Sequence, residues 1–489
     1  MATTTRLAVA APSEAAADAG ERVARAGGNA VDAAIAASLV AMVSEVGVVS
    51  LSAGGFVTVQ PGDGADDPTP YTVDGWMDMP GRDRGVAELP PGSTWDVTTD
   101  YGGGVDITIG PGSVAVHGAV AALGVAHERD GRVPWREVVA PAVEVAGAGF
   151  RLGQAARYYL DHVHDDIFGW DDESRAALHT AEGEVTTEPI VVPGLAESVA
   201  QLAAEGPASM YTGGLAERIG RDVLDRGGLL GPADLAAYRA VVHPCVTSRL
   251  GDWTLSSTPP PSVGGVCLTA MLRLLDGWSP EAPDAVDRLV AVQRRVLGHR
   301  LEVLDHSDDV ATDAAAFLQV IESGSTAHIS ATDADGGACA ITISSGYGSG
   351  MVAAGTGIWL NNCLGEQELN PRGLHGSAPG TRLLSNMAPT VGRRADGATL
   401  AIGSPGADRI TSALAVVLGC FAAGVSLVDA VNHPRVHVHR AGRPDEVVRT
   451  EAEPSMYFGG VGATLAEPGG HLVAAADPRR AGAVRVVGG

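Results

Sequence analysis

Small apolar residues fill the segment 31–43 almost without interruption, directly after the turn residues Gly27, Gly28 and Asn29. Because alanine and leucine favour the helix, this segment predicts a helix that packs closely against a sheet. Helical patterns also cover residues 135–148 and 284–304. Residues 257–265 include three consecutive prolines, so we expect that segment to be non-helical.

After Ser323 the pattern changes from helical periodicity to alternation. Residues 326–332 and 338–344 alternate between apolar and polar positions, and the turn residues 333–337 separate them. This arrangement predicts a β-hairpin. Alanine-rich helices combined with antiparallel hairpins predict an α+β fold in which helices cover the sheets, as in a layered αββα plan.

Composition and charge exclude several classes of protein. The chain has 489 residues, 45% of them hydrophobic, and its 33 basic and 58 acidic side chains give a net charge of −25. Nucleic-acid binding needs concentrated Lys and Arg, so we expect no nucleic-acid partner. The apolar stretches 34–43 and 413–428 are shorter than the ~18–20 residues of a membrane span, and no secretory signal opens the chain. We therefore expect a cytoplasmic protein without a membrane partner. The absence of lysine is typical of GC-rich coding, as in actinobacteria.

The residue types that bind metals do not form a recognisable motif. The cysteines are odd in number and lack CxxC spacing, which disfavours disulfides and a zinc site and predicts free thiols; they are Cys245, Cys267, Cys339, Cys363 and Cys420. Residues 161–166 carry Asp and His around a predicted helix and indicate a solvated face. His437 and His439 would share one face of a strand, but no carboxylate is near them in the sequence. We expect a packed or surface strand there, and neither a metal nor a cofactor.

Glycine- and serine-rich turns are concentrated after the predicted hairpin. Four of them lie within about ninety residues, a concentration that predicts backbone amides gathered around a reacting centre. They cover residues 346–350, 355–362, 384–390 and 403–410.

These motifs, in this order, resemble the gamma-glutamyltranspeptidase family of N-terminal-nucleophile (Ntn) hydrolases. The resemblance runs nearly end to end and includes residues 27–34, 111–114 and 259–265 as well as the hairpin and its turns. It implies a four-layer αββα sandwich made as one precursor, which cuts itself between Ser325 and Thr326. The products would be a large subunit, 1–325, and a small catalytic subunit, 326–489, that stay associated. A larger oligomer is left open.

The same resemblance implies the catalytic residues. Thr326 corresponds to the nucleophile, and its freed α-amino group would serve as the base that a weakly nucleophilic hydroxyl requires. Ser344 falls where the family has a threonine that hydrogen-bonds the nucleophile. Gly406 and Ala407 fall where two glycines offer backbone N–H groups as an oxyanion hole. Alanine keeps its N–H group, provided that its φ and ψ permit the geometry.

The pocket that binds the substrate departs from the family pattern. Trp76 replaces the arginine that holds the substrate carboxylate, and tryptophan offers one N–H group and a flat apolar face instead. Glu366 replaces the aspartate that holds the substrate amine. Of the two serines that bind carboxylate oxygen, Ser385 is kept and Asn386 replaces the other. Asn362 belongs to the same pocket. The catalytic parts are thus kept and the glutamyl-binding parts are altered.

We therefore expect a self-processing Thr hydrolase or acyltransferase that acts through a covalent intermediate on Thr326. Its substrate would be a small, amino-acid-like molecule other than glutathione. A second hypothesis is a C–C bond hydrolase for the 4-alkylproline units of lincomycin- or pyrrolobenzodiazepine-type antibiotics, as in specialised actinobacterial relatives. A third is a conventional gamma-glutamyl hydrolase or transferase, and a fourth is an inactive relative that acts as a binding or scaffold protein.

Overall fold

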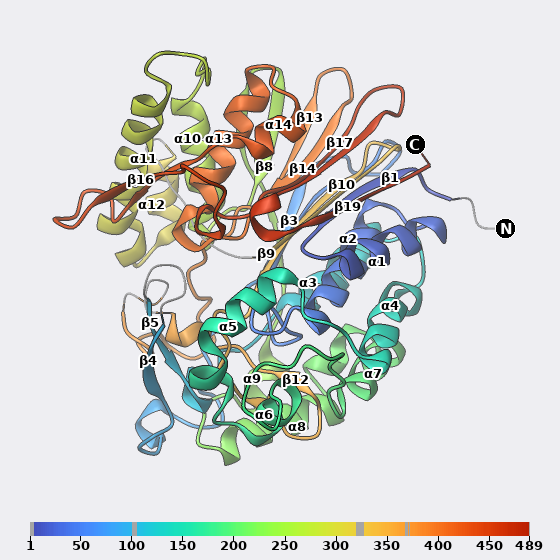
Figure 1. Cartoon of the computed structure of the whole chain (residues 1–489), viewed down its shortest axis with the longest axis vertical. Coiled ribbons are helices and arrows are strands. Elements are labelled where there is room, and N and C mark those ends of the chain that lie inside the picture. The colour runs from blue at the N-terminus through green and yellow to red at the C-terminus, as the bar shows by residue number, and fades with distance from the viewer. Residues whose placement is uncertain (1–3, 100–104, 319–326, 367–369, 371, 489) are drawn as a thin grey trace.

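Two antiparallel sheets lie face to face at the centre of the protein, as Figure 1 shows for the computed structural model. The structure describes residues 4–99, 105–318, 327–366, 370 and 372–488. In the order of their pairing, the strands of the first sheet are β19 (Ala483–Val487), β1 (Leu7–Ala11), β9 (Ala327–Asp333), β10 (Ala338–Ser344), β2 (Gly54–Gln60), β3 (Tyr71–Gly75) and β6 (Val241–Pro244).

The second sheet is built mainly from the C-terminal third of the chain. Its strands, in the order of their pairing, are β18 (Leu472–Ala476), β17 (Gly462–Ala466), β14 (Thr399–Gly403), β13 (Thr390–Arg394), β8 (Trp253–Ser257) and β7 (Val246–Leu250). Strands β9 and β10 contact β14 of this sheet. The hairpin predicted after Ser323 therefore lies at the interface between the two sheets.

Helices cover the outer face of each sheet (Figure 1). The first sheet is covered by α1 (Glu14–Arg25), α2 (Ala30–Ser44) and α3 (Ala119–Asp130). The second is covered by α10 (Val263–Leu274), α13 (Ile410–Ala422) and α14 (Leu427–Asn432), with α11 (Ala285–Glu302) and α12 (Val310–Phe317) beyond them. The predicted αββα arrangement is confirmed.

The remaining elements extend beyond these four layers. They are α4 (Trp135–Ala148), α5 (Gln154–Phe168), α6 (Asp172–Leu178), α7 (Leu195–Glu205), α8 (Gly214–Asp225), α9 (Pro232–Ala237), β4 (Trp95–Thr99), β5 (Val105–Ile109), β11 (Val352–Ala353), β12 (Ile358–Trp359), β15 (Val436–His439) and β16 (Val447–Thr450). Within the ranges described, no helix has both the length and the apolar character needed to cross a bilayer.

Helix α2 shows why the sequence folds as it does at the first sheet. Asn29 caps the helix by accepting hydrogen bonds from the N–H groups of Val31 and Asp32. The Asp32 carboxylate in turn accepts a bond from the Asn29 N–H group, which completes a capping box. Every residue of α2 is buried, and the helix contacts β9 and β10. The predicted helix and its packing on a sheet are confirmed.

One local prediction is wrong. Residues 257–265 were expected to be non-helical throughout, but α10 begins at Val263. Ser262 caps it by accepting a hydrogen bond from the Gly264 N–H group, so the prolines precede the helix rather than interrupt it.

Candidate active site

The β9–β10 hairpin brings Ser344 close to the point where β9 begins. Ala327 pairs with Ile343, and Ser344 lies one residue beyond that pair, opposite Gly54 of β2. The Ser344 hydroxyl accepts a hydrogen bond from the Gly346 N–H group at 2.9 Å. Ser325 and Thr326 lie outside the described residues.

The turn after Ser344 packs against two predicted substrate-binding residues. Gly346 has φ +67°, and a Cβ atom there would lie 2.4 Å from Asn362 Oδ1 and 3.1 Å from Glu366 Oε1. Only glycine fits both this conformation and this close approach. Asn362 holds the turn by accepting a bond from the Tyr347 N–H group at 2.7 Å and donating one to the Thr108 carbonyl at 3.2 Å. The structure thus brings Ser344, Asn362 and Glu366 together.

Glu366 is buried with its carboxylate beside a thiol. It is 7% exposed. Burial and the Glu366 carboxylate together raise the pKa of Cys363 well above its usual value, so this cysteine stays a thiol. The side chain of Asn370 donates to the Cys363 and Glu366 carbonyls at 2.7 and 3.1 Å. The backbone that carries Glu366 is therefore held at both ends of this short turn.

Ser385 and Asn386 lie in a buried loop that α10 supports. The Val263 N–H group donates to the Ser385 carbonyl at 2.9 Å, and the Ser262 hydroxyl donates to the Met387 carbonyl at 2.6 Å. The proline-rich motif and the cap of α10 thus fix the position of the loop. The Ser385 hydroxyl accepts from the Met387 N–H group at 3.2 Å.

Asn386 carries a buried donor that the described protein does not satisfy. Its Oδ1 accepts a hydrogen bond from Arg300 Nη2 at 2.7 Å, which fixes the orientation of the amide. Arg300 is held in turn by Asp305, whose two carboxylate oxygens lie 3.0 Å from Arg300 Nε. Asn386 Nδ2 has no hydrogen-bond partner among the described residues. A buried unpaired N–H group costs about 1–3 kcal/mol, so this amide is suited to a ligand oxygen.

The turn with the predicted oxyanion hole has an unusual backbone. Gly406 has φ +134°, and a Cβ atom there would lie 2.9 Å from Gly459 Cα. Ala407 has φ +52°, the left-handed region that glycine tolerates better than alanine. The Ala407 N–H group is kept, at a cost of roughly 1–2 kcal/mol in backbone strain. The short helix η8 (Ala407–Arg409) follows and leads into α13.

A histidine that sequence reasoning missed connects this turn to the hairpin. His328, on β9, packs so closely on β14 that a Cβ atom on Gly403 would lie 2.3 Å from its Nδ1. Its ring nitrogens lie 2.9 Å from Thr342 Oγ1 and 2.6 Å from Ser330 Oγ. Burial lowers the pKa of His328 to about 3, so the ring is neutral. The tight Gly403 contact brings the chain leading to Gly406 close to the start of β9.

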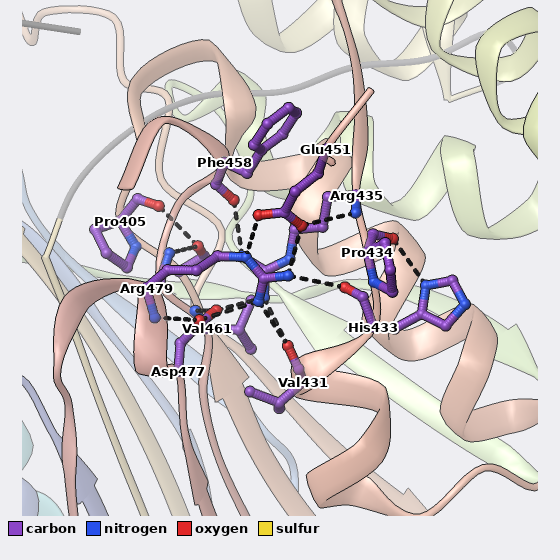
Figure 2. A network of polar contacts seen from close by, with 12 residues as sticks. Pro405, Val431, His433, Pro434, Arg435, Glu451, Phe458, Val461, Asp477 and Arg479 are labelled. Carbon is purple, nitrogen blue, oxygen red and sulfur yellow. Dashed lines mark hydrogen bonds and ion pairs between the residues drawn. The ribbon is translucent and has the colours of Figure 1, made fainter. Parts of the chain in front are cut away.

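Four buried charged residues hold the segments around that turn. Figure 2 shows the guanidinium groups of Arg435 and Arg479 between Glu451 and Asp477. All four side chains are at most 2% exposed. Asp477 also accepts from the Val461 N–H group at 2.9 Å. The network ties the start of β17 and the end of β18 to the chain around β15.

Trp76, which the resemblance places in the substrate pocket, is buried in the core. It is 1% exposed and stacks on Phe56, with ring centroids 6.3 Å apart. Its indole N–H group donates to the Leu384 carbonyl at 2.7 Å, next to Ser385. The bond from its indole N–H group ties Trp76 to the loop that carries Ser385.

A nearby arginine does not restore the missing clamp. Arg382 lies with its Nε 3.1 Å from Asp78 and 3.6 Å from Asp74, and its side chain is 16% exposed. Its charge is therefore engaged by two carboxylates. Burial, opposed by Arg382, raises the pKa of Asp78 to about 6.

The segments that carry metal-binding residue types differ in their surroundings. Residues 161–166 lie on α5 with mostly exposed side chains, as predicted. His437 and His439 lie on strand β15, also as predicted, but the fold places the carboxylate of Asp408 beside both rings. The five cysteines are free, as expected.

Two stacked antiparallel sheets between helical layers, with a central hairpin that begins directly after a threonine, define the class of Ntn hydrolases. The chain belongs to the gamma-glutamyltranspeptidase family, whose model, described as "Gamma-glutamyltranspeptidase", matches residues 16–320 and 305–487. It is therefore an enzyme of this hydrolase class.

Curated relatives are named as hydrolases and acylases. The glutathione hydrolase proenzyme of Escherichia coli K12 is 28% identical, over 93% of this chain and 87% of its own length. The glutathione hydrolase proenzyme of Pseudomonas aeruginosa is 30% identical, over 88% of this chain and 82% of its own length. The acylase ACY 1 proenzyme of Pseudomonas sp. strain SE83 is 29% identical, over 86% of this chain and 80% of its own length.

Solved structures share the fold over nearly the whole chain. Cephalosporin acylase from Bacillus halodurans superposes with a TM-score of 0.79 at 20% identity, covering 99% of this chain and 96% of its own. A structure of LmbA superposes with a TM-score of 0.76 at 21% identity, covering 99% of this chain and 98% of its own. At these identities the likeness establishes the fold alone.

Proposed function

We propose that the protein is a self-processing threonine hydrolase or acyltransferase that acts on a small amino-acid-like substrate other than glutathione. Cleavage between Ser325 and Thr326 would free the Thr326 amine. What supports this most directly is the set of groups around the start of β9: Ser344, the Gly346 turn with Glu366, and the Gly403 contact that leads to Gly406.

We expect the proposed nucleophile to lie near these groups, because it precedes Ala327 directly in the chain. Consecutive Cα atoms are about 3.8 Å apart, so residue 326 is tethered to Ala327, which pairs with Ile343 beside Ser344. The Thr326 hydroxyl would attack the substrate carbonyl and pass its proton to its own α-amino group. An α-amine titrates near pH 7.7–8.0 in model compounds, which suits it as a base at neutral pH.

The remaining steps follow from the residues at hand. The N–H groups of Gly406 and Ala407 would stabilise the oxyanion of the tetrahedral intermediate. On collapse, the C–N bond breaks and the leaving amine takes the proton from the Thr326 ammonium. Water, or an amine acceptor, then attacks the ester on Thr326 by the same route and releases the acyl group.

The interleaved first sheet supports stable association after cleavage. Strands β1, β2, β3 and β6 come from residues 1–325, whereas β9, β10 and β19 come from residues 326–489. Strand β1 pairs with both β9 and β19. Separating the two products would break these ladders and expose the core beneath them, so the products should stay together.

The polar groups at the site support an amino-acid-like substrate. The buried Glu366 carboxylate is suited to a substrate ammonium, and Asn386 Nδ2 is a neutral donor for a carbonyl or carboxylate oxygen. Without an arginine at position 76, a full glutamyl carboxylate loses a charge-assisted pair worth roughly 1.5–3 kcal/mol. Gamma-glutamyl-p-nitroanilide should therefore be a poor substrate compared with other amino-acid p-nitroanilides.

A second candidate is hydrolysis of a C–C bond beside a carbonyl in a 4-alkylproline precursor. Attack by Thr326 on a ketone would use the same oxyanion hole as attack on an amide. The neutral Asn386 donor and the loss of the arginine favour a substrate group other than a glutamyl headgroup, and the fold shared with LmbA is compatible with this candidate.

A denaturing gel tests the proposal before any substrate is known. The purified wild-type chain should separate into residues 1–325 and 326–489, and Thr326→Ala should stay whole and inactive. Thr326→Ser, which keeps a hydroxyl, is the matched control and should still be cut. A wild-type chain that stays whole, or cleavage of Thr326→Ala at the normal rate, would contradict the proposal and favour a scaffold role.

A further inference from the structure

Two imidazoles and one carboxylate converge directly after the predicted oxyanion turn. Asp408 Oδ2 lies 3.1 Å from His437 Nε2 and 2.8 Å from His439 Nδ1. One ligand atom from each of the three residues lies within 4.8 Å of the other two. His437 is fully buried, whereas the His439 side chain is 38% exposed and gives access from solvent.

The fold assembles this cluster from two separate segments. His437 and His439 are two residues apart on β15, so their side chains leave the same face of the strand. Asp408 lies in η8, about thirty residues earlier, between Ala407 and α13. Each residue keeps its backbone in regular structure, so the three side chains converge from rigid elements.

Outer contacts orient two of the three ligand residues, His437 and Asp408. Ser412 Oγ lies 3.0 Å from His437 Nδ1, which leaves Nε2 toward Asp408. Arg409 Nη1 donates to Asp408 Oδ1 at 2.7 Å, which leaves Oδ2 toward the two rings. Partners of this kind on the atoms that do not bind the metal typically fix the first ligands of a metal centre.

The side chain of Tyr457, which packs beside His437, also bears on this site. The Tyr457 hydroxyl oxygen is buried and has no hydrogen-bond partner within the part of the chain that the structure describes. The rings of Tyr457 and His437 lie with their centroids 6.3 Å apart. The Arg409 guanidinium carbon lies 4.7 Å from the centroid of the Tyr457 ring. A water molecule carried by a metal ion could supply the missing partner.

We propose that Asp408, His437 and His439 bind one zinc ion, with a water molecule as the fourth ligand. Two imidazole nitrogens and one carboxylate oxygen form a donor set that suits tetrahedral Zn²⁺, with bonds of about 2.0–2.2 Å. Such bonds place neighbouring ligand atoms about 3.3 Å apart. The distances of 2.8 and 3.1 Å therefore need to widen by only a few tenths of an ångström.

The ion would fix η8 and with it the position of Ala407. The charge of Asp408 is balanced by Arg409, so the ion adds positive charge next to the turn that carries the oxyanion hole. Zinc binding itself is independent of the proposed reaction. It can therefore be tested on a chain that has lost its nucleophile.

Zinc titration of the full chain tests this site. Thr326→Ala protein is freed of metal with a chelator, dialysed and titrated with Zn²⁺ alone by calorimetry, and loaded with Co²⁺ for absorption spectroscopy. We expect one ion per chain, a visible Co²⁺ spectrum typical of tetrahedral coordination, and a higher Tm with Zn²⁺.

Three variants decide whether these residues hold the ion. His439→Gln and Asp408→Asn should each lower zinc affinity at least tenfold and abolish the Tm shift. His433→Gln, which removes a half-buried histidine of the same segment, should leave both unchanged. If Asp408→Asn does not fold, His439→Gln still tests the site, because it changes a half-exposed position. Absence of stoichiometric binding, or equal binding by chains with and without His439→Gln, would overturn the assignment and leave a hydrogen-bonded cluster only.

Discussion

Replacing Asp477 with asparagine should destabilise the protein far more than the loss of one charge at its surface. The Asp477 carboxylate accepts four hydrogen bonds: from both guanidinium groups of Figure 2 and from the N–H groups of Val461 and Arg479, the latter two at 2.9 Å. An asparagine of the same size presents an NH₂ group to some of these donors. It also removes the carboxylate that pairs with the buried Arg435 guanidinium and leaves Arg479 paired with Glu451 in the described network.

The expected magnitude follows from burial. Arg435, Arg479 and Asp477 are each 1% exposed in their side chains, so water cannot replace the lost contacts. Removing one partner from a buried ion pair costs about 3–5 kcal/mol. We expect Asp477→Asn to lower the free energy of unfolding by that amount.

Asp396→Asn provides the matched control. Asp396 also pairs with an arginine, Arg394, at 2.8 Å, but its side chain is 48% exposed. The control makes the same change of residue and of net charge, and a surface pair of this kind contributes little to stability because water screens it.

Urea unfolding followed by tryptophan fluorescence measures both variants. All chains carry Thr326→Ala, so that each unfolds as one covalent polypeptide. At equal m values, the difference between the two midpoints multiplied by m gives the difference in the free energy of unfolding. A loss for Asp477→Asn that is no larger than the loss for Asp396→Asn would show that the buried network does not stabilise the fold.

Three further outcomes can be measured in the same way. Ala407→Gly should raise the free energy of unfolding by up to about 1 kcal/mol, because glycine relieves the strain at φ +52°; an unchanged midpoint would contradict this. Burial raises the pKa of Glu45 to about 7, so the folded state holds a proton that the unfolded state releases near pH 4.5. Stability should therefore fall as pH rises from about 4.5 to 7, and Glu45→Gln should remove a penalty of roughly 3 kcal/mol at pH 8 but little at pH 4. Trp76→Arg should cost at least about 3 kcal/mol, since it buries a charge beside Phe56, and Trp76→Phe should cost less; a Trp76→Arg chain that is stable and turns over gamma-glutamyl-p-nitroanilide faster would refute this.

Local pattern was enough to predict the central elements of the fold. The buried helix α2 and the β9–β10 hairpin follow from residue types that lie next to one another, such as the Asn29 cap and the turn after Asp333. The order of the motifs then indicated the family and the layered architecture. Propensity, capping and alternation act within a few residues, so they can be read directly from the sequence.

Contacts between distant segments were decided by tertiary packing alone. Trp76 was predicted from its position in a motif to contact the substrate, but packing on Phe56 and a bond to Leu384, 308 residues away, place it in the core. Arg300 orients Asn386 across 86 residues of chain.

The same reason explains the two histidines. His437 and His439 lack a carboxylate in their own segment, and Asp408 reaches them only because η8 and β15 pack together. Alternation along the strand determined that the two rings share a face. The groups that contact this face are determined by how the layers pack. The pattern of one segment carries no information about the residues of another.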